Sequence, residues 1–352
     1  MSAITIGGDL IHYEVLGRGR PVILLHGWLG SWRYWVPTMQ QLQTKYRVYA
    51  LDLRGFGDSG KNPQKYTLDH QVQLVFDFMR ELGLPKAAFI GHGLGALVAS
   101  EFARLYGDKV PRMLLVSAPL FDPGGLDTRI PAGRLVPLTD NKPQPPSGDA
   151  VKPLAPEATI MNAGTAMRAA LQEAARARTS YTEPPKPTDP TLLKPTLPLP
   201  DLNERKDARH NPLTEMLDAA LENLLAKCFR RTEPEYEKLS VDLAKIDAAA
   251  IKQSITDFDS GRMLDRIRLL PMPMVIMHGM DDQLIQQPNE NVWNYLTKDR
   301  EDSLRPVLLR SVRHFPMLEN ESFLRITNEF LDIADVSKME SDKQERWKRR
   351  TR

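Results

Sequence analysis

The chain has 352 residues, of which 41% are hydrophobic and 26% are charged, and its formal net charge is +2. These values are ordinary for a soluble globular protein of one large or two smaller domains, and they give no argument for a nucleic-acid partner. A single cysteine, Cys228, excludes an internal disulfide, and the chain has neither a signal-peptide pattern nor an apolar run of ~18 residues, so we predict a cytoplasmic protein without a membrane span.

The first 119 residues alternate strand and helix patterns. Residues 21–25 form a continuous apolar run, which is typical of a strand buried on both faces of a sheet. Strands that alternate with helices predict a doubly wound, mostly parallel α/β sheet. We expect strands at 4–6, 11–15, 21–25, 46–52, 86–90 and 113–117, and helices at 31–43, 67–82 and 97–106.

The composition changes after Ala118. More than half of the chain's 28 prolines lie between Pro119 and Pro212. Proline has no N–H to donate and interrupts helices, so the richest stretches, 130–157 and 181–212, are predicted to be extended loop. We interpret residues 120–254 as a lid or cap insertion that is partly loop. Its helices are expected at 158–178, 213–229 and 233–255.

The sheet pattern returns after residue 255. Strands are expected at 272–277 and 306–309, and helices at 289–296 and 320–336. The α/β core is therefore predicted to comprise residues 1–119 and 255–338. The remaining residues, 339–352, form a basic C-terminal tail that we expect to be solvated.

The stretch 89–97 combines an apolar run, a glycine-rich turn and the start of a helix. This is the layout of a nucleophile elbow, whose pattern is Gly-x-nucleophile-x-Gly. Gly91 and Gly95 supply the outer glycines. The nucleophile position itself is Gly93, which has no side chain.

Five short motifs, each at the end of a strand pattern, occur in one order along the chain. They are His26-Gly27-Trp28, Arg54-Gly55-Phe56-Gly57-Asp58-Ser59, Gly91-His92-Gly93-Leu94-Gly95, Gly279-Met280-Asp281-Asp282 and His314-Phe315-Pro316-Met317-Leu318-Glu319. In this order they resemble the α/β-hydrolase superfamily, in the branch with esterases, epoxide hydrolases and carbon–carbon bond hydrolases. The resemblance covers about 1–119 and 255–336.

The resemblance implies roles for particular residues. Asp282, or its neighbour Asp281, would be the acid that orients a histidine, and His314 would be that histidine. The backbone N–H groups of Trp28 and Leu94 would form the oxyanion hole. Gly93 departs from the family, because ester hydrolysis there requires serine, and dehalogenases and epoxide hydrolases require aspartate.

The ligand-binding residues are predicted from the same motifs. Trp28, His26 and Phe315 are candidates for contact with a substrate, although core packing explains each aromatic side chain as well. His92 and His278 are expected to be structural rather than reactive. We predict no cofactor and no metal site, and nothing in the sequence specifies an oligomeric state.

Three functions remain open at this point. The first is a non-catalytic or diverged member of the fold that binds a small apolar ligand or a partner. The second is an active hydrolase that uses water activated by His314 and Asp282, or a variant of a serine esterase in which glycine replaces the serine. The third is a scaffold role for the proline-rich block and the tail.

Overall fold

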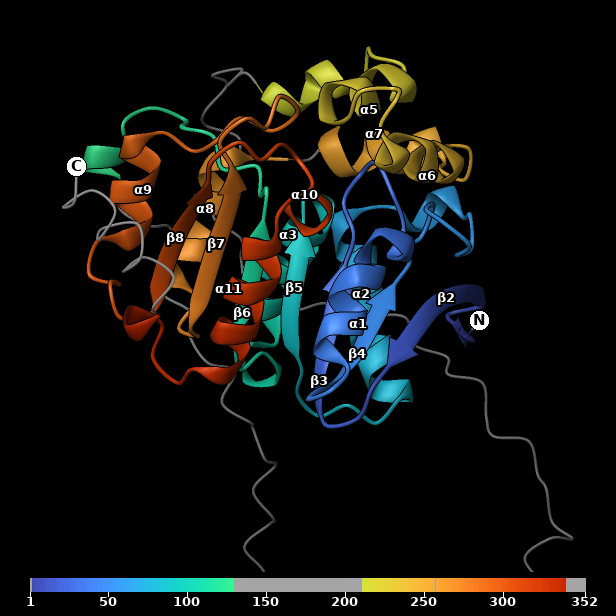
Figure 1. Cartoon of the computed structure of the whole chain (residues 1–352), viewed down its shortest axis with the longest axis horizontal. Helices are drawn as coiled ribbons and strands as arrows, with labels where there is room; N and C mark the ends of the chain where they lie inside the picture. Colours follow the sequence, from blue (N-terminus) through green and yellow to red (C-terminus); the bar gives the residue numbers. More distant parts are fainter. Residues whose placement is uncertain (1, 130–210, 257, 340–352) are drawn as a thin grey trace, which may run out of the picture. The chain divides into compact units, whose positions relative to one another are not determined.

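An eight-stranded sheet runs through the described part of the chain in the order β1-β2-β4-β3-β5-β6-β7-β8 (Figure 1). The computed structural model describes residues 2–129, 211–256 and 258–339, which belong to one unit of the chain formed by 1–136 and 209–352. The strands are β1 Ser2–Ile6, β2 Asp9–Leu16, β3 Arg20–Leu25, β4 Tyr46–Leu51, β5 Ala88–His92, β6 Met113–Val116, β7 Met274–Gly279 and β8 Leu304–Leu309.

Six of these strands, β4-β3-β5-β6-β7-β8, pair in parallel, whereas β1 and β2 form an antiparallel hairpin at one edge. All residues of β5, β6 and β7 are buried, as continuous apolar runs predict for strands covered on both faces. The predicted doubly wound, mostly parallel sheet is therefore confirmed. Its carboxyl ends collect the loops that carry the predicted site residues.

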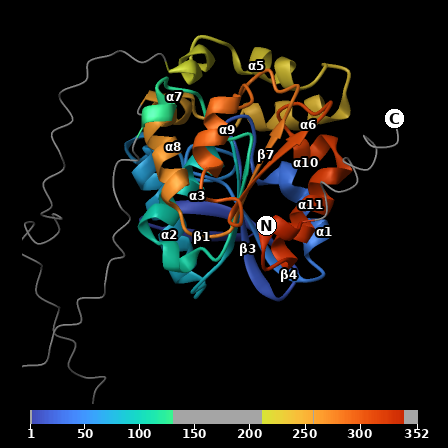
Figure 2. The same ribbon diagram turned by 90° about the vertical axis from the view of Figure 1, so that its left-hand side faces the viewer.

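Helices cover both faces of this sheet. Helices α2, α3 and α8 pack in a row on one face, and α1 and α11 pack together on the other (Figure 2). The helices and single 3₁₀ turns (η) are η1 Trp32–Trp35, α1 Val36–Leu42, η2 Pro63–Lys65, α2 Leu68–Glu81, α3 Leu94–Leu105, η3 Gly107–Lys109, η4 Leu126–Thr128, η6 Pro212–Met216, α5 Leu221–Cys228, α6 Pro234–Leu243, α7 Ala248–Thr256, α8 Ser260–Leu269, α9 Glu290–Thr297, α10 Pro316–Glu319, α11 Glu321–Asp332 and η7 Val336–Lys338.

Helices α5, α6 and α7 lie over the carboxyl ends of the strands (Figure 1). Two buried hydrogen bonds join α6 and α7 to the loop that follows β3. The Trp28 indole N–H donates to Ser254 Oγ at 2.9 Å, and Ser31 Oγ donates to Asp242 Oδ2 at 2.6 Å. This segment therefore packs directly against the loops at the end of the sheet.

The sequence placed most core elements within a few residues, but two helix predictions are wrong. The single helix predicted at 233–255 is split into α6 and α7. Asp247 lies between them, where it accepts a 2.8 Å hydrogen bond from the Tyr66 hydroxyl while its own N–H donates to the Gly55 carbonyl. These contacts to distant residues turn the chain out of a continuous helix. The predicted helix at 213–229 is likewise divided into η6 and α5.

Helix α8 was not predicted at all. It is capped by Asp259, whose side chain accepts from the Arg262 N–H. Gly261 and several arginines obscure its apolar stripe, although the Asp cap was a usable signal. The helix predicted at 158–178, the loop at 130–157, nearly all of that at 181–212 and the tail beyond Met339 lie outside the described residues. The domain boundaries therefore stay predictions.

Candidate active site

A tight turn at Gly93 joins β5 to α3. Gly93 has φ 50° and ψ −110°, a conformation that residues with a Cβ adopt only under strain. Its N–H donates to the Val116 carbonyl at 3.0 Å, and the Gly95 N–H donates to the His26 carbonyl at 3.0 Å. The strand–turn–helix expected at 89–97 is present, and hydrogen bonds to β6 and to the loop after β3 hold it.

The outer glycines of this turn allow helix α3 to approach the sheet closely. A Cβ added at Gly91 would lie 2.4 Å from the Gly95 carbonyl oxygen, and a Cβ added at Gly95 would lie 2.2 Å from the Leu25 carbonyl oxygen. Both distances are far below a van der Waals contact. These two glycines are therefore required by packing, whatever the chemistry at the turn.

His314 and Asp282, on the loops after β8 and β7, form a buried pair. His314 Nδ1 lies 2.8 Å from Asp282 Oδ2, and Asp282 Oδ1 accepts from the N–H groups of Leu284 and Ile285 at 2.9 Å each. Burial raises the pKa of Asp282, but the charge and hydrogen bonds around it outweigh burial and lower the pKa to about 2. Asp281, the alternative acid, is exposed, so the geometry pairs His314 with Asp282.

The other ring nitrogen of His314 has no hydrogen-bond partner among the described residues, although the side chain is only 1% exposed. Because Nδ1 points to Asp282, Nε2 points to the opposite side of the ring. The His314 ring also lies against His92, with ring centroids 4.5 Å apart, and His92 directly precedes Gly93. The His314 ring therefore lies next to the end of β5, whose last residue is His92.

The two backbone N–H groups predicted for the oxyanion hole are also unused. Neither Trp28 N–H nor Leu94 N–H donates to another described residue. Leu94 is the first residue of α3, and Gly93 offers no side chain to cap that helix. A helix N-terminus carries partial positive charge, which favours an anion or a carbonyl oxygen at this place.

A chain of hydrogen bonds connects the loops that meet here. The Gly27 N–H donates to Tyr34 Oη at 2.6 Å, and Tyr34 Oη lies 2.9 Å from His92 Nδ1. His92 Nε2 lies 2.9 Å from the backbone carbonyl of His314. Since a carbonyl can only accept, Nε2 carries the proton and Nδ1 accepts from the Tyr34 hydroxyl. Burial, followed by the charge of His314, holds the pKa of His92 well below its usual range, so His92 is neutral.

The fold and these motifs have counterparts among known proteins. Residues 20–184 match the family model described as the alpha/beta hydrolase fold. The chain has the α/β-hydrolase fold, and part of its sequence is similar to members of that superfamily. Among curated members, human epoxide hydrolase 4 is 36% identical over 116 residues, which are 32% of this chain and 32% of that protein. Rat bifunctional epoxide hydrolase 2 is 31% identical over 122 residues, 33% of this chain and 22% of that protein.

The chain thus spans about a fifth to a third of the length of these two curated relatives. A solved structure of a hydrolase from Pseudomonas aeruginosa PA01 aligns over 94% of this chain and 98% of its own, with a TM-score of 0.59 and 16% identity. That likeness concerns the fold alone.

Within the described residues, no helix has the length and apolar character that crossing a membrane requires.

The aromatic residues predicted to contact a ligand, Trp28 and Phe315, are both buried. The Trp28 ring lies beside the elbow: a Cβ added at Gly93 would meet Trp28 Cε3 at 3.2 Å and Cζ3 at 3.3 Å. Phe315 packs between Tyr34 and Phe229, with ring centroids 5.4 Å from each. Trp28 therefore packs tightly against Gly93, whereas Phe315 joins the sheet loops to α5.

His26 orders the loop after β3. Its Nδ1 lies 2.8 Å from the Gly27 carbonyl, and its Nε2 accepts from the Leu53 N–H at 2.9 Å. Both ring nitrogens are thus bonded to backbone groups, and contact of His26 with a ligand stays a prediction. His278 is also buried, with Nε2 2.8 Å from the Ile285 carbonyl, next to the loop that carries Asp282.

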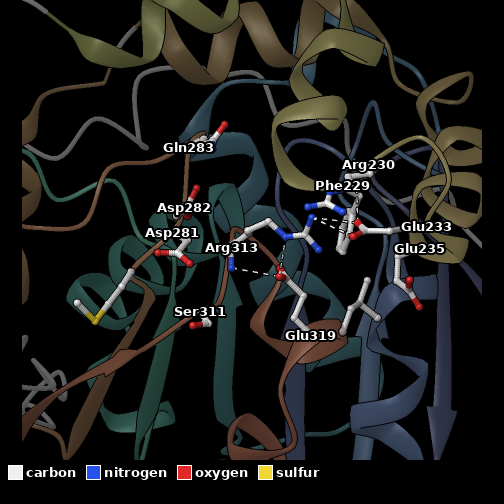
Figure 3. A pocket seen from close by; sticks show the side chains of 12 residues that line it. Phe229, Arg230, Glu233, Glu235, Asp281, Asp282, Gln283, Ser311, Arg313 and Glu319 are labelled. Atoms are coloured by element: carbon white, nitrogen blue, oxygen red, sulfur yellow. Dashed lines mark hydrogen bonds and ion pairs between the residues drawn. The ribbon is translucent and has the colours of Figure 1, made fainter.

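An open pocket of about 880 Å³ adjoins the acid loop (Figure 3). At its centre, Arg313 forms ion pairs of 2.9 Å with Glu319 and with Glu233, and its guanidinium lies 4.8 Å from the centre of the Phe229 ring. Arg313 directly precedes His314, so these contacts tie the histidine loop to the segment between α5 and α6. No local sequence pattern indicates this link, because Arg313 and Glu233 are far apart along the chain.

One group of side chains has the composition of a metal site. His12, Asp52 and Asp58 bring three ligand-type atoms within 4.8 Å of one another. However, Asp58 forms ion pairs with Arg33 at 2.7 Å and Lys245 at 2.6 Å. Those two cations already neutralise Asp58, so the group is better explained as a structural network than as a cation site.

Proposed function

We propose that this protein binds a small apolar ligand beside Gly93 and forms no covalent intermediate with it. One observation carries this proposal: the residue at the turn after β5 has no side chain, while a buried acid–histidine pair is present on the loops after β7 and β8 and the N–H groups of Trp28 and Leu94 have no partner among the described residues. Helices α5 to α7 and the indole of Trp28, which are linked through Ser254, would form part of a lid over the ligand.

The absence of a side chain at Gly93 matters because the covalent mechanism of such sites begins with an attack by that side chain. The histidine takes a proton from a serine, or an aspartate attacks directly, and the acid keeps the imidazole oriented. Glycine offers neither a hydroxyl nor a carboxylate. Loss of the nucleophile from a comparable triad lowers turnover on the order of a millionfold. The pair of Asp282 and His314 would then serve binding rather than nucleophile activation.

A second candidate is hydrolysis by direct attack of water, and the unpartnered Nε2 of His314 favours it. His314 would take one proton from a water as its oxygen bonds to the carbonyl carbon of an ester. The N–H groups of Trp28 and Leu94 would hold the oxyanion. As the C–O bond breaks, His314 would return the proton to the departing alkoxide. A serine esterase in which glycine has replaced serine is the other form of this candidate.

Hydrolysis of p-nitrophenyl acetate and butanoate tests these candidates. We expect the unmodified protein to remain at background, and Gly93→Ser to gain activity that disappears in Gly93→Ser/His314→Ala. Gly83→Ser is the matched control, because Gly83 also has positive φ but lies at the end of α2. Circular dichroism verifies that each variant folds.

Activity of the unmodified protein that His314→Ala abolishes would overturn the non-catalytic proposal and support attack by water. Because the two curated relatives described above are named epoxide hydrolases, Gly93→Asp with styrene oxide is the parallel test for that chemistry. If a folded Gly93→Ser showed no gain, the acid–histidine pair and the two N–H groups would not be assembled into the site described above, and this argument for a site at Gly93 would fail.

A further inference from the structure

The loop that carries His314 contains neither helix nor strand. It runs from the end of β8 to the start of α10. The N–H groups of such a loop have no partner in a regular ladder, so other groups must accept from them. The N–H of Arg313 and the N–H of Phe315 both donate to the carboxylate of Glu319, at 3.1 and 3.2 Å. These two residues directly flank His314, so one carboxylate holds the chain on both sides of the histidine.

Glu319 uses both of its carboxylate oxygens on this loop. Oε1 accepts from the Phe315 N–H, and Oε2 accepts from the N–H of Arg313 and, at 2.9 Å, from Nε of the Arg313 guanidinium (Figure 3). The Glu319 side chain is only 9% exposed. Phe315 is the residue that precedes α10, so capping of that short helix explains its contact. Capping does not explain the contact with the Arg313 N–H, which lies beyond His314.

Other contacts show that the chain at His314 is held from the opposite direction as well. The His314 carbonyl accepts from His92 Nε2 at 2.9 Å and from Ser117 Oγ at 3.2 Å. The ring then places Nδ1 2.8 Å from Asp282 Oδ2. Asp282 is fixed separately, by two N–H groups of its own loop. The acid and the histidine therefore have independent anchors, and Glu319 belongs to that of the histidine.

We infer that Glu319 is a positioning residue, which holds His314 within hydrogen-bond distance of Asp282. Among the described residues, no hydrogen bond joins Glu319 to the imidazole, so Glu319 acts through the loop. A hydrogen bond is lost when its atoms separate by a few tenths of an ångström to an ångström. A small displacement of the loop would therefore break the 2.8 Å contact of the pair. This role goes beyond the proposed function, because it does not depend on which ligand the site takes.

Glutamine at this position would keep the shape of the side chain and lose part of its acceptor capacity. An amide has one oxygen, and its NH₂ group can only donate. In Glu319→Gln, the N–H of either Arg313 or Phe315 therefore loses its acceptor. A buried N–H without an acceptor costs more than the hydrogen bond itself contributes. We expect the loop to open more often, and the His314 ring to leave Asp282 with it.

Glu233→Gln is the matched control. Glu233 pairs with the same guanidinium of Arg313, also at 2.9 Å, but accepts from neither N–H group that flanks His314. The side chains of Arg313 and Glu233 are 28% and 29% exposed, so water screens their attraction. This variant removes a charge beside Arg313 and leaves the hydrogen bonds of Glu319 intact.

Hydrogen exchange of the His314 ring, followed by NMR in the full chain with isotope-labelled histidine, tests this role. Since a carboxylate only accepts, Nδ1 carries a proton, and the signal that His314→Gln removes identifies it. Glu319→Gln should speed its exchange at least about tenfold. Glu233→Gln should change it by no more than about threefold. The proton on His278 Nε2, which donates to the Ile285 carbonyl, should exchange at an unchanged rate in both variants.

A second measurement needs no variant. In the unmodified protein, the N–H groups of Arg313 and Phe315 should open at the rate of the His314 ring proton, because one anchor holds all three. Rapid exchange of these two groups beside a protected ring proton would overturn the inference. A ring proton that exchanges too fast to observe in the folded, unmodified protein would also overturn it.

The variants can overturn the inference in three further ways. Glu319→Gln could leave the His314 proton unchanged, or Glu233→Gln could speed its exchange equally, which would assign the effect to the charge beside Arg313. Glu319→Gln could also speed exchange at His278, which would indicate general loosening. None of these measurements involves a ligand. Ester hydrolysis by the unmodified protein would therefore overturn the proposed function and leave the role of Glu319 standing.

Discussion

Replacing Gly93 with alanine should destabilise the protein through two separable effects. The first is backbone strain, because φ at Gly93 is 50° and ψ is −110°. Such a conformation costs a non-glycine residue about 1–3 kcal/mol, of which about 0.4–1 kcal/mol is offset because alanine restricts the unfolded chain. The net contribution of the backbone is therefore a loss of about 0–2.5 kcal/mol of unfolding free energy.

The second effect is crowding by Trp28. The new Cβ would lie 3.2 and 3.3 Å from two ring carbons, so the indole must move by a few tenths of an ångström. The ring cannot shift freely, because it is fully buried and its N–H donates to Ser254 Oγ. Overpacking of this kind costs about 1–3 kcal/mol. We expect a total loss of about 1–5 kcal/mol for Gly93→Ala.

Urea unfolding followed by circular dichroism measures this loss. Gly83→Ala is the matched control, because Gly83 has φ 63° but a Cβ there would meet no atom within 4 Å. Gly93→Ala should therefore cost at least 1 kcal/mol more than Gly83→Ala. Combining Gly93→Ala with Trp28→Phe, which shortens the ring, should recover most of that difference. Equal losses for the two alanine variants would refute the crowding argument.

Two further predictions concern the polar network. Because the pKa of Asp282 in the folded protein is about 2, below its ordinary value, its stabilising contribution is complete at pH 5 and is lost as the pH falls through 2. The stability difference between the unmodified protein and Asp282→Asn should therefore shrink by about 1–2 kcal/mol from pH 5 to pH 2.5 in urea unfolding, and a constant difference would contradict this pKa. Tyr34→Phe leaves the Gly27 N–H and His92 Nδ1 without partners. It should therefore lower the free energy of unfolding by about 1–3 kcal/mol in the same measurement. No loss in Tyr34→Phe would show that this chain of hydrogen bonds does not stabilise the loops.

The sequence predicted the sheet well because its information is local. Strand β3 is a continuous apolar run, and Thr67 before α2 is a capping residue whose side chain accepts from the His70 N–H, as the pattern suggested. The positions of Gly93, Asp282 and His314 came from motif order. Each motif follows a strand, and parallel strands bring their carboxyl ends to one edge.

Contacts between distant residues could not be predicted in this way. The break between α6 and α7 depends on Asp247 meeting Tyr66 and Gly55, and the link from Arg313 to Glu233 joins residues from separate elements. Neither pairing leaves a periodic pattern in the sequence. These contacts stabilise the protein only after the chain has folded. The local sequence pattern therefore predicted one continuous helix at 233–255, where the structure has α6 and α7.

The geometry also explains why the glycines that flank Gly93 are required whether or not the turn carries a nucleophile. Gly91 and Gly95 are fixed by the close approach of α3 to the sheet, and the turn is fixed by the hydrogen bonds of Gly93 and Gly95. None of these constraints involves a side chain at Gly93, and glycine adopts the turn with less strain than serine. The Gly-x-x-x-Gly frame is therefore a packing requirement of the fold, and it says nothing by itself about catalysis. Evidence for function must come from groups that packing leaves unsatisfied, and His314 Nε2 is such a group.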